Sequence, residues 1–177
     1  GKLDEAKVYL RRNIEIEKKY ERWDDAALGM DLLALIFSWE GNYSQALDLR
    51  YQALSFLKKT NDIHGQADIL NNIGTIYMET SSFLKALEYF NKALLLFLDL
   101  NEKSDVAMAY NNIGSVLIVL NKPQKAKFYI DKSIEIRTEI NDSSGLAHSF
   151  LKMGEMYRSL KKFDEAEEWF FKSIEIT

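Results

Sequence analysis

The residues with the most obvious chemistry are two histidines, because the chain has no cysteine to act as a nucleophile or a thiolate ligand. His64 and His148 are far apart in sequence, and no acidic pair is spaced to complete a metal site with either. The acidic run at 164–168 is expected on a solvated helix face, and residues 143–145 (Ser-Ser-Gly) have no base nearby. Isolated glycines form no phosphate-binding loop. We therefore predict no metal, no cofactor and no catalytic residue, and hence no enzyme.

Amide chemistry is more suggestive, because the tetrapeptide Asn-Asn-Ile-Gly occurs at 71–74 and again at 111–114. An asparagine amide donates and accepts at once, so it can bind a peptide backbone without reading its side chains. A structural alternative is that these asparagines are solvated or cap neighbouring loops. Deciding between the two requires the elements that carry the asparagines.

The separation of forty residues is a repeat that runs through the chain. Residues 64–103 and 104–143 share ten identities in forty positions, and Ile-Glu-Ile recurs at 14–16, 134–136 and 174–176. Internal repeats of this length are typical of stacked helical units. Gly1 aligns with Gly41, so we expect the chain to begin partway through a repeat.

Each repeat has the pattern of two helices. Apolar and small residues follow the i, i+3, i+4, i+7 spacing of one helical face, as in Leu70, Ile73, Gly74 and Tyr77. A glycine inside a helix costs about 1 kcal/mol relative to alanine, so Gly74 indicates a close helix contact. Turn signals separate the helices, and Asn-Asp or Asn-Glu pairs between repeats favour a left-handed helix end followed by an N-cap.

This pattern resembles the tetratricopeptide repeat (TPR) family, in a long form similar to the repeats of kinesin light chains and of bacterial regulatory arrays. The resemblance rests on a small residue in the first helix, an aromatic or aliphatic residue three positions later, and an alanine twelve positions after the small residue. The small residues are Ala34, Gly74, Gly114 and Gly154. The residues three positions later are Phe37, Tyr77, Leu117 and Tyr157, and the alanines are Ala46, Ala86, Ala126 and Ala166. The repeat is six residues longer than the usual unit of thirty-four and lacks its closing proline.

The resemblance implies an all-α fold, a right-handed α-solenoid of antiparallel helix pairs with a concave groove. We expect a single TPR-like solenoid over 1–177. It would comprise the second helix of a truncated repeat at 1–22 and four helix pairs at 23–62, 63–102, 103–142 and 143–177.

On a helical wheel, the asparagines lie opposite the packing stripe, on the arc that lines the groove in this family. We therefore expect both asparagines of each pair to face away from the core. The predicted partner-binding groove consists of Leu28, Asp31, Leu32, Leu35, Trp39, Asp68, Asn71, Asn72, Thr75, Asn111, Asn112, Ser115, Lys152, Glu155 and Arg158.

The first repeat gives this groove an apolar surface around Leu28, Leu32 and Trp39, which marks an interaction site or a surface covered by another part of the protein. The last helix, from Phe163, is also rich in apolar residues. We expect Phe163, Phe170 and Ile174 to pack inward and Trp169 or Phe171 to remain outside, where it would favour self-association.

Bulk properties narrow the class of partner. A net charge of −4 argues against nucleic acid, and the longest apolar runs are too short to span a membrane. We expect a cytoplasmic protein-interaction module that binds a peptide, helix or protein in its groove. The alternative is an intramolecular regulatory array for signal transduction that controls an effector domain; an enzyme would need a clustered acid, base or metal site.

Overall fold

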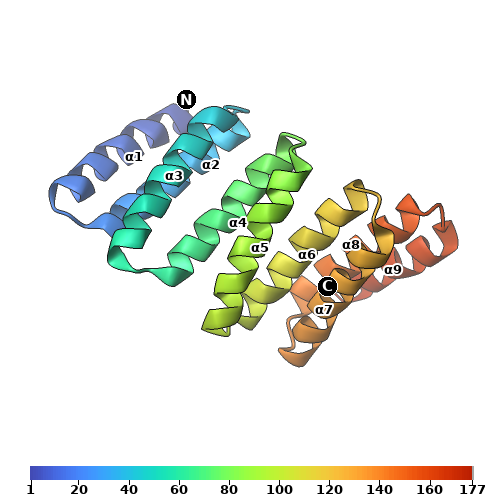
Figure 1. Cartoon of the computed structure of the whole chain (residues 1–177). Coiled ribbons are helices and arrows are strands. Elements are labelled where there is room, and N and C mark those ends of the chain that lie inside the picture. The colour runs from blue at the N-terminus through green and yellow to red at the C-terminus, as the bar shows by residue number, and fades with distance from the viewer. Residues whose placement is uncertain (177) are drawn as a thin grey trace. The chain divides into compact units, whose positions relative to one another are not determined.

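The computed structural model describes residues 1–176, and all of its regular elements are helices (Figure 1). They form two compact units, 1–82 and 83–177. The first contains α1 (Lys2–Lys19), α2 (Trp23–Trp39), α3 (Tyr43–Thr60) and α4 (Ile63–Glu79). The second contains α5 (Phe83–Leu100), α6 (Lys103–Val119), α7 (Pro123–Glu139), α8 (Ser143–Ser159) and α9 (Phe163–Glu175).

Helix positions agree with the forty-residue pattern. The helices α2, α4, α6 and α8 begin at Trp23, Ile63, Lys103 and Ser143, at intervals of forty residues. Pro123 occupies the first turn of α7, where its missing N–H removes no helical hydrogen bond. Within the first unit, α1 packs on α2, α2 on α3 and α3 on α4. Within the second, consecutive helices from α5 to α9 pack together, and α6 also contacts α8.

Every connection between helices uses the same turn. One residue adopts a positive φ every twenty residues, and the backbone N–H of the next residue donates to the carbonyl five positions back, at 2.7–3.1 Å. The eight residues are Glu21, Gly41, Asn61, Ser81, Asn101, Asn121, Asn141 and Lys161. The Asn-Asp and Asn-Glu pairs between repeats begin at Asn61, Asn101 and Asn141, and the left-handed helix ends that these pairs predict are therefore confirmed.

Small residues create the close contacts that the sequence predicts. The four alanines of the second helices, including Ala46 and Ala126, are buried. A Cβ on Gly114 would lie 2.8 Å from Ile130 Cγ1, and one on Gly154 would lie 2.4 Å from the ring of Phe170. Both distances are too short for a carbon contact, so at these two positions glycine is needed for the helices to approach.

The last helix differs in part from expectation. Phe170 is half-buried against Gly154, as predicted, but Phe163 and Ile174 are exposed. The prediction that these two pack inward is wrong, because α9 contacts α8 through a different set of side chains: Ala166 is buried, Phe170 lies against Gly154, and Trp169 lies against Phe150. Phe171 is 56% exposed.

Candidate partner-binding site

The first helices of two successive pairs, α2 and α4, form an exposed surface in the first unit, which we call the α2–α4 face. Leu28, Leu32, Leu35 and Trp39 are exposed on it, as the wheel predicts, and Trp39 is 68% exposed. Two hollows of about 330 and 320 Å³ lie along this face. One lies by the N-terminal ends of α2 and α4, and the other lies by their C-terminal ends.

A polar network holds the face together between the hollows. Arg50 of α3 is only 4% exposed, and its Nε donates to Asp31 Oδ1 at 2.8 Å. Its Nη1 donates to the backbone carbonyl of Asn72 at 2.9 Å, and Asn72 Nδ2 donates to Asp31 Oδ2 at 3.1 Å. A buried guanidinium requires such partners, because an unpaired buried charge is strongly unfavourable. The network therefore ties α2, α3 and α4 at one point.

Sequence reasoning found Asp31 and Asn72 but missed Arg50. The signal was present: the positions forty, eighty and 120 residues after Arg50 hold Phe90, Ile130 and Phe170. A charged residue in an otherwise apolar column indicates a buried ion pair or a functional site.

The hollow at the N-terminal ends is acidic. Its walls are the apolar residues Ala27, Leu28, Leu57 and Ile69, and its polar lining includes Asp24, Asp25, Asp31, Asp62, Asp68 and His64. Asp24 accepts a hydrogen bond from Thr60, and Asp62 caps α4 by accepting from the Gly65 N–H at 2.9 Å. Asp68 lies 3.4 Å from His64 Nδ1.

The excess of carboxylates over cations gives this hollow a negative potential. Among the described residues, the cation paired with Asp25 is Arg22, whose Nε lies 3.9 Å from Asp25 Oδ2, and Arg22 already pairs with Glu17. An acidic hollow with apolar walls suits a lysine or arginine side chain, whose stem is apolar and whose end is charged.

The hollow at the C-terminal ends is aromatic and apolar. Leu35, Trp39, Tyr43 and Ile76 line it, together with Ser38, Arg50, Asn72, Thr75 and Glu79. Thr75 Oγ1 donates to the backbone carbonyl of Asn71 at 3.3 Å, so its hydroxyl proton is used within α4. This hollow suits an apolar side chain.

The expectation that both asparagines of each pair face away from the core is wrong for the first of each pair. Asn71 is 6% exposed and Asn111 is 2% exposed, whereas Asn72 and Asn112 are half-buried. In the second unit the reason is a second neighbour, since Asn111 Nδ2 donates to Ser149 Oγ of α8 at 2.9 Å. The helical wheel accounts for only one packing stripe on α6, and α8 contacts the helix outside that stripe.

Asn111 belongs to a buried polar cluster. Ser149 Oγ lies 3.0 Å from Ser133 Oγ, and Ser133 Oγ accepts from Arg137 Nε at 3.3 Å. Arg137 Nη1 donates to Asp142 Oδ2 at 2.7 Å. Within the described residues, the buried Asn111 Oδ1 has no hydrogen-bond partner.

The remaining predicted groove residues lie in the second unit, on α6 and α8. Ser115 Oγ donates to the Asn111 carbonyl at 3.0 Å, and Lys152 forms an ion pair with Glu155 at 3.0 Å. Arg158 is exposed. Partial burial, then Lys152 and Arg137, lower the pKa of His148, which favours its neutral form.

Among the described residues, no group of three or more His, Cys, Asp or Glu side chains is placed to hold a metal ion. Within the same residues, none of the helices has the length and apolar composition needed to cross a membrane.

The model of a known repeat family matches most of the chain. It is described as "Tetratricopeptide repeat", and it matches residues 65–139 and 105–177. The chain belongs to the tetratricopeptide repeat family. No curated protein matches its sequence.

Several solved structures have a similar fold. BtubC (BKLC) from P. vanneervenii is 22% identical, with a TM-score of 0.86 over 99% of this chain and 73% of that chain. A candidate kinesin light chain from Podosopora anserina with nearly identical TPR-like repeats is 15% identical, with a TM-score of 0.76 over 99% of this chain and 87% of that one. Aspartyl phosphate phosphatase F from Bacillus subtilis is 20% identical, with a TM-score of 0.77 over 96% of this chain and 54% of that one. These similarities show that this TPR protein has an all-α repeat solenoid fold.

Proposed function

We propose that this TPR protein is a protein-interaction module whose α2–α4 face binds a basic peptide that also carries apolar side chains. The observation that supports the proposal is the acidic hollow beside exposed Leu28 and Leu32, with the Trp39 hollow on the same face. Basic side chains would enter the first hollow and apolar side chains the second. Such a mixed surface provides an attractive field and apolar area for the same ligand.

The family and the similar structures support a partner-binding role. TPR proteins are interaction scaffolds, and a similar Rap protein was solved in complex with Competence and Sporulation Factor. The Rap protein is 16% identical in sequence to this chain, with a TM-score of 0.77 over 96% of this chain and 57% of the Rap chain.

The backbone-binding role of the asparagines is narrower than the sequence suggests. Asn72 Nδ2 already donates to Asp31, so a partner's carbonyl would have to compete with a carboxylate for that N–H. Asn71 and Asn111 are buried. We therefore assign binding to the acidic and aromatic hollows, and a positioning role to the asparagines of this face.

A binding experiment tests this proposal. A fluorescent peptide alternating lysine and leucine is compared by anisotropy with a matched peptide that has glutamate in place of lysine. We expect the lysine peptide to bind at least about tenfold more tightly at 0.15 M salt and to weaken at higher salt, because exposed charge attraction is screened. Asp25→Asn with Asp68→Asn should remove most of this preference, and Trp39→Ala should weaken binding of both peptides.

The matched control is Glu167→Gln with Glu168→Gln, which removes the same two charges from exposed positions on α9. It should leave peptide binding unchanged. Equal affinity for the two peptides, or an Asp25/Asp68 variant that behaves like the parent, would overturn the proposal.

The same chemistry would serve an intramolecular ligand, so the regulatory array remains the alternative function. A basic, apolar segment of a longer chain would occupy the α2–α4 face and be displaced when an effector is released. If a segment of a longer natural chain already occupies the α2–α4 face, the lysine–leucine peptide should bind that longer chain more weakly than it binds residues 1–177.

We also propose self-association through α9, but by Phe171 rather than Trp169. The Trp169 ring lies 5.4 Å from the Phe150 ring, and Lys172 Nζ lies 4.2 Å above it, so intramolecular contacts already use this side chain. Phe171 is exposed. An uncovered phenylalanine forgoes about 1.5–3 kcal/mol of burial, which contact between copies would recover.

Sedimentation velocity over a range of protein concentrations checks this prediction. The mean sedimentation coefficient should rise with concentration for the parent and for Leu84→Glu, a change at a similarly exposed apolar position on α5. It should stay at the monomer value for Phe171→Glu. A parent that remains monomeric throughout would show that α9 does not mediate association.

A further inference from the structure

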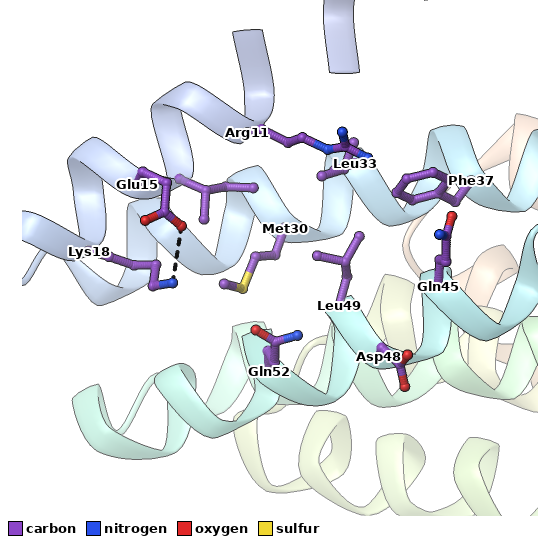
Figure 2. A pocket seen from close by; sticks show the side chains of 11 residues that line it. Arg11, Glu15, Lys18, Met30, Leu33, Phe37, Gln45, Asp48, Leu49 and Gln52 are labelled. Atoms are coloured by element: carbon purple, nitrogen blue, oxygen red, sulfur yellow. Dashed lines mark hydrogen bonds and ion pairs between the residues drawn. The ribbon is translucent and has the colours of Figure 1, made fainter. Parts of the chain in front are cut away.

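A larger hollow lies elsewhere in the first unit, between α1 and α3 over α2, and we call it the α1–α3 pocket (Figure 2). Its volume is about 460 Å³, within the range of small-ligand sites. Its floor is apolar, and its rim is charged or polar. It shares no lining residue with either hollow of the α2–α4 face.

The repeat pattern explains why this space is open. In the second unit, the matching positions hold two aromatic residues that contact each other. Tyr110 and Tyr129 have ring centroids 5.8 Å apart, and those of Phe150 and Trp169 are 5.4 Å apart. In the first repeat these two positions are Met30 and Leu49. Figure 2 shows their side chains directed into the space between α1 and α3.

A lysine completes the aromatic arrangement in two other repeats. Lys92 Nζ lies 4.8 Å from the Tyr89 ring, and Lys172 Nζ lies 4.2 Å from the Trp169 ring. Gln52 occupies the matching position in the first repeat. The α1–α3 pocket therefore lacks the ring that fills this site elsewhere in the chain, and the lysine that packs on that ring.

The rim supplies its own charges. Arg11 of α1 lies with its Cζ 5.8 Å from the Phe37 ring, so its guanidinium reaches over the pocket from one wall. Asp48 of α3 lies on the other wall. Lys18 and Glu15, which complete the charged rim, form an ion pair with each other at 3.2 Å. Among the described residues, Arg11 and Asp48 form no ion pair.

From these observations we propose that the α1–α3 pocket binds an aromatic side chain of a partner polypeptide. The ring would take the place that a tyrosine or tryptophan fills in the other repeats, over Met30 and Leu49. The Arg11 guanidinium would contact the face of this ring as a cation. Arg11 would also attract acidic groups of the partner, and Asp48 would attract basic groups. Aromatic side chains give the largest apolar contact for the volume available.

Methyl NMR of the protein labelled at its methionines tests the proposal with N-acetyl-tryptophanamide as the probe. We expect a saturable shift of the Met30 methyl signal, with a dissociation constant on the order of millimolar for so small a ligand. N-acetyl-leucinamide should shift it at least about tenfold less at equal concentration. Free tryptophan should bind no more tightly than the amide, because the pocket is proposed to recognise a residue within a polypeptide chain. Tighter binding of the free amino acid would contradict the proposal that the ligand is part of a polypeptide.

Filling the pocket provides the decisive variant. Leu49→Tyr restores the residue of the second and third repeats, and Met30→Phe fills the space from α2 should the first variant fail to fold. Each folded variant, checked by circular dichroism, should lose the probe-induced shifts, followed at the neighbouring backbone amides. Gln52→Lys is the matched control, since it restores the lysine of the other repeats but leaves the pocket open, and it should keep binding.

Arg11→Gln should weaken binding about two- to fivefold, through loss of the cation over the ring. Absence of a saturable shift in the parent, or an undiminished shift in a folded Leu49→Tyr or Met30→Phe protein, would refute the aromatic site.

Discussion

Replacing Arg50 with alanine is expected to destabilise the first unit by about 3–5 kcal/mol, since removal of one partner of a buried ion pair leaves the other uncompensated. Asp31 would keep only the hydrogen bond from Asn72, and the Asn72 carbonyl would lose its donor. Asp31 retains some contact with water, which places the effect toward the lower end of that range.

Urea denaturation followed by tryptophan fluorescence measures this effect. Trp23 and Trp39 lie in the first unit and Trp169 in the second, so a Trp169→Phe background makes the signal specific for the first unit. Glu15→Ala, which removes a surface ion pair with Lys18 in the same unit, should change stability by about 1 kcal/mol or less.

A compensating pair sharpens the test. The third repeat holds Asn111 and Ile130 at the positions of Asp31 and Arg50. Arg50→Ile with Asp31→Asn should therefore recover most of the lost stability, because it removes both charges together. An Arg50→Ala protein within about 1 kcal/mol of the parent would show that the network contributes little.

Replacing Gly114 with alanine is the second change with a large expected effect, and here helix propensity and packing oppose each other. Alanine favours a helix interior by about 1 kcal/mol. The added Cβ would lie 2.8 Å from Ile130 Cγ1, and Ile130 is fully buried. Overpacking of a core contact costs about 1–3 kcal/mol, so we expect a net loss of stability in the second unit.

A double-mutant cycle separates the two contributions. In an Ile130→Ala background the clash is absent, so Gly114→Ala should become neutral or stabilising. Chemical denaturation followed by Trp169 fluorescence, with Trp23 and Trp39 replaced by phenylalanine, reports on this unit. A stabilising effect of Gly114→Ala in the presence of Ile130 would contradict the close-contact explanation.

Helix positions, turns and the small-residue contacts could be predicted from the sequence because a forty-residue repeat tests each inference several times. Asn61, Asn101 and Asn141 indicated their left-handed helix ends, and Gly114 and Gly154 indicated close contacts. Such features depend on backbone geometry and on one neighbouring helix. The continuity of a single right-handed solenoid over residues 1–177 stays a prediction, because the two units are described separately.

The site was harder to predict because it depends on several neighbours at once. A helical wheel assigned Asn111 to an open face, but α8 covers it and supplies the Ser149 hydroxyl. The wheel also gave no reason to connect Arg50 with Asp31, which lies nineteen positions earlier on another helix. The α1–α3 pocket could have been suspected from Met30 and Leu49, which replace aromatic residues, but only the structure shows that no other side chain of the described residues fills the space.

The identical turn every twenty residues has a consequence for changes in chain length. Glu21, Ser81 and Lys161 adopt a positive φ of 56–59° where Gly41 has a φ of 77°, so the turn depends on position more than on residue type. One residue inserted within a helix would rotate all later side chains of that helix by about 100°, and would carry apolar residues away from their contacts. Substitutions at the turns should therefore be tolerated where single-residue insertions and deletions in the helices are not. Natural length variation in this chain should occur in whole repeats of forty residues.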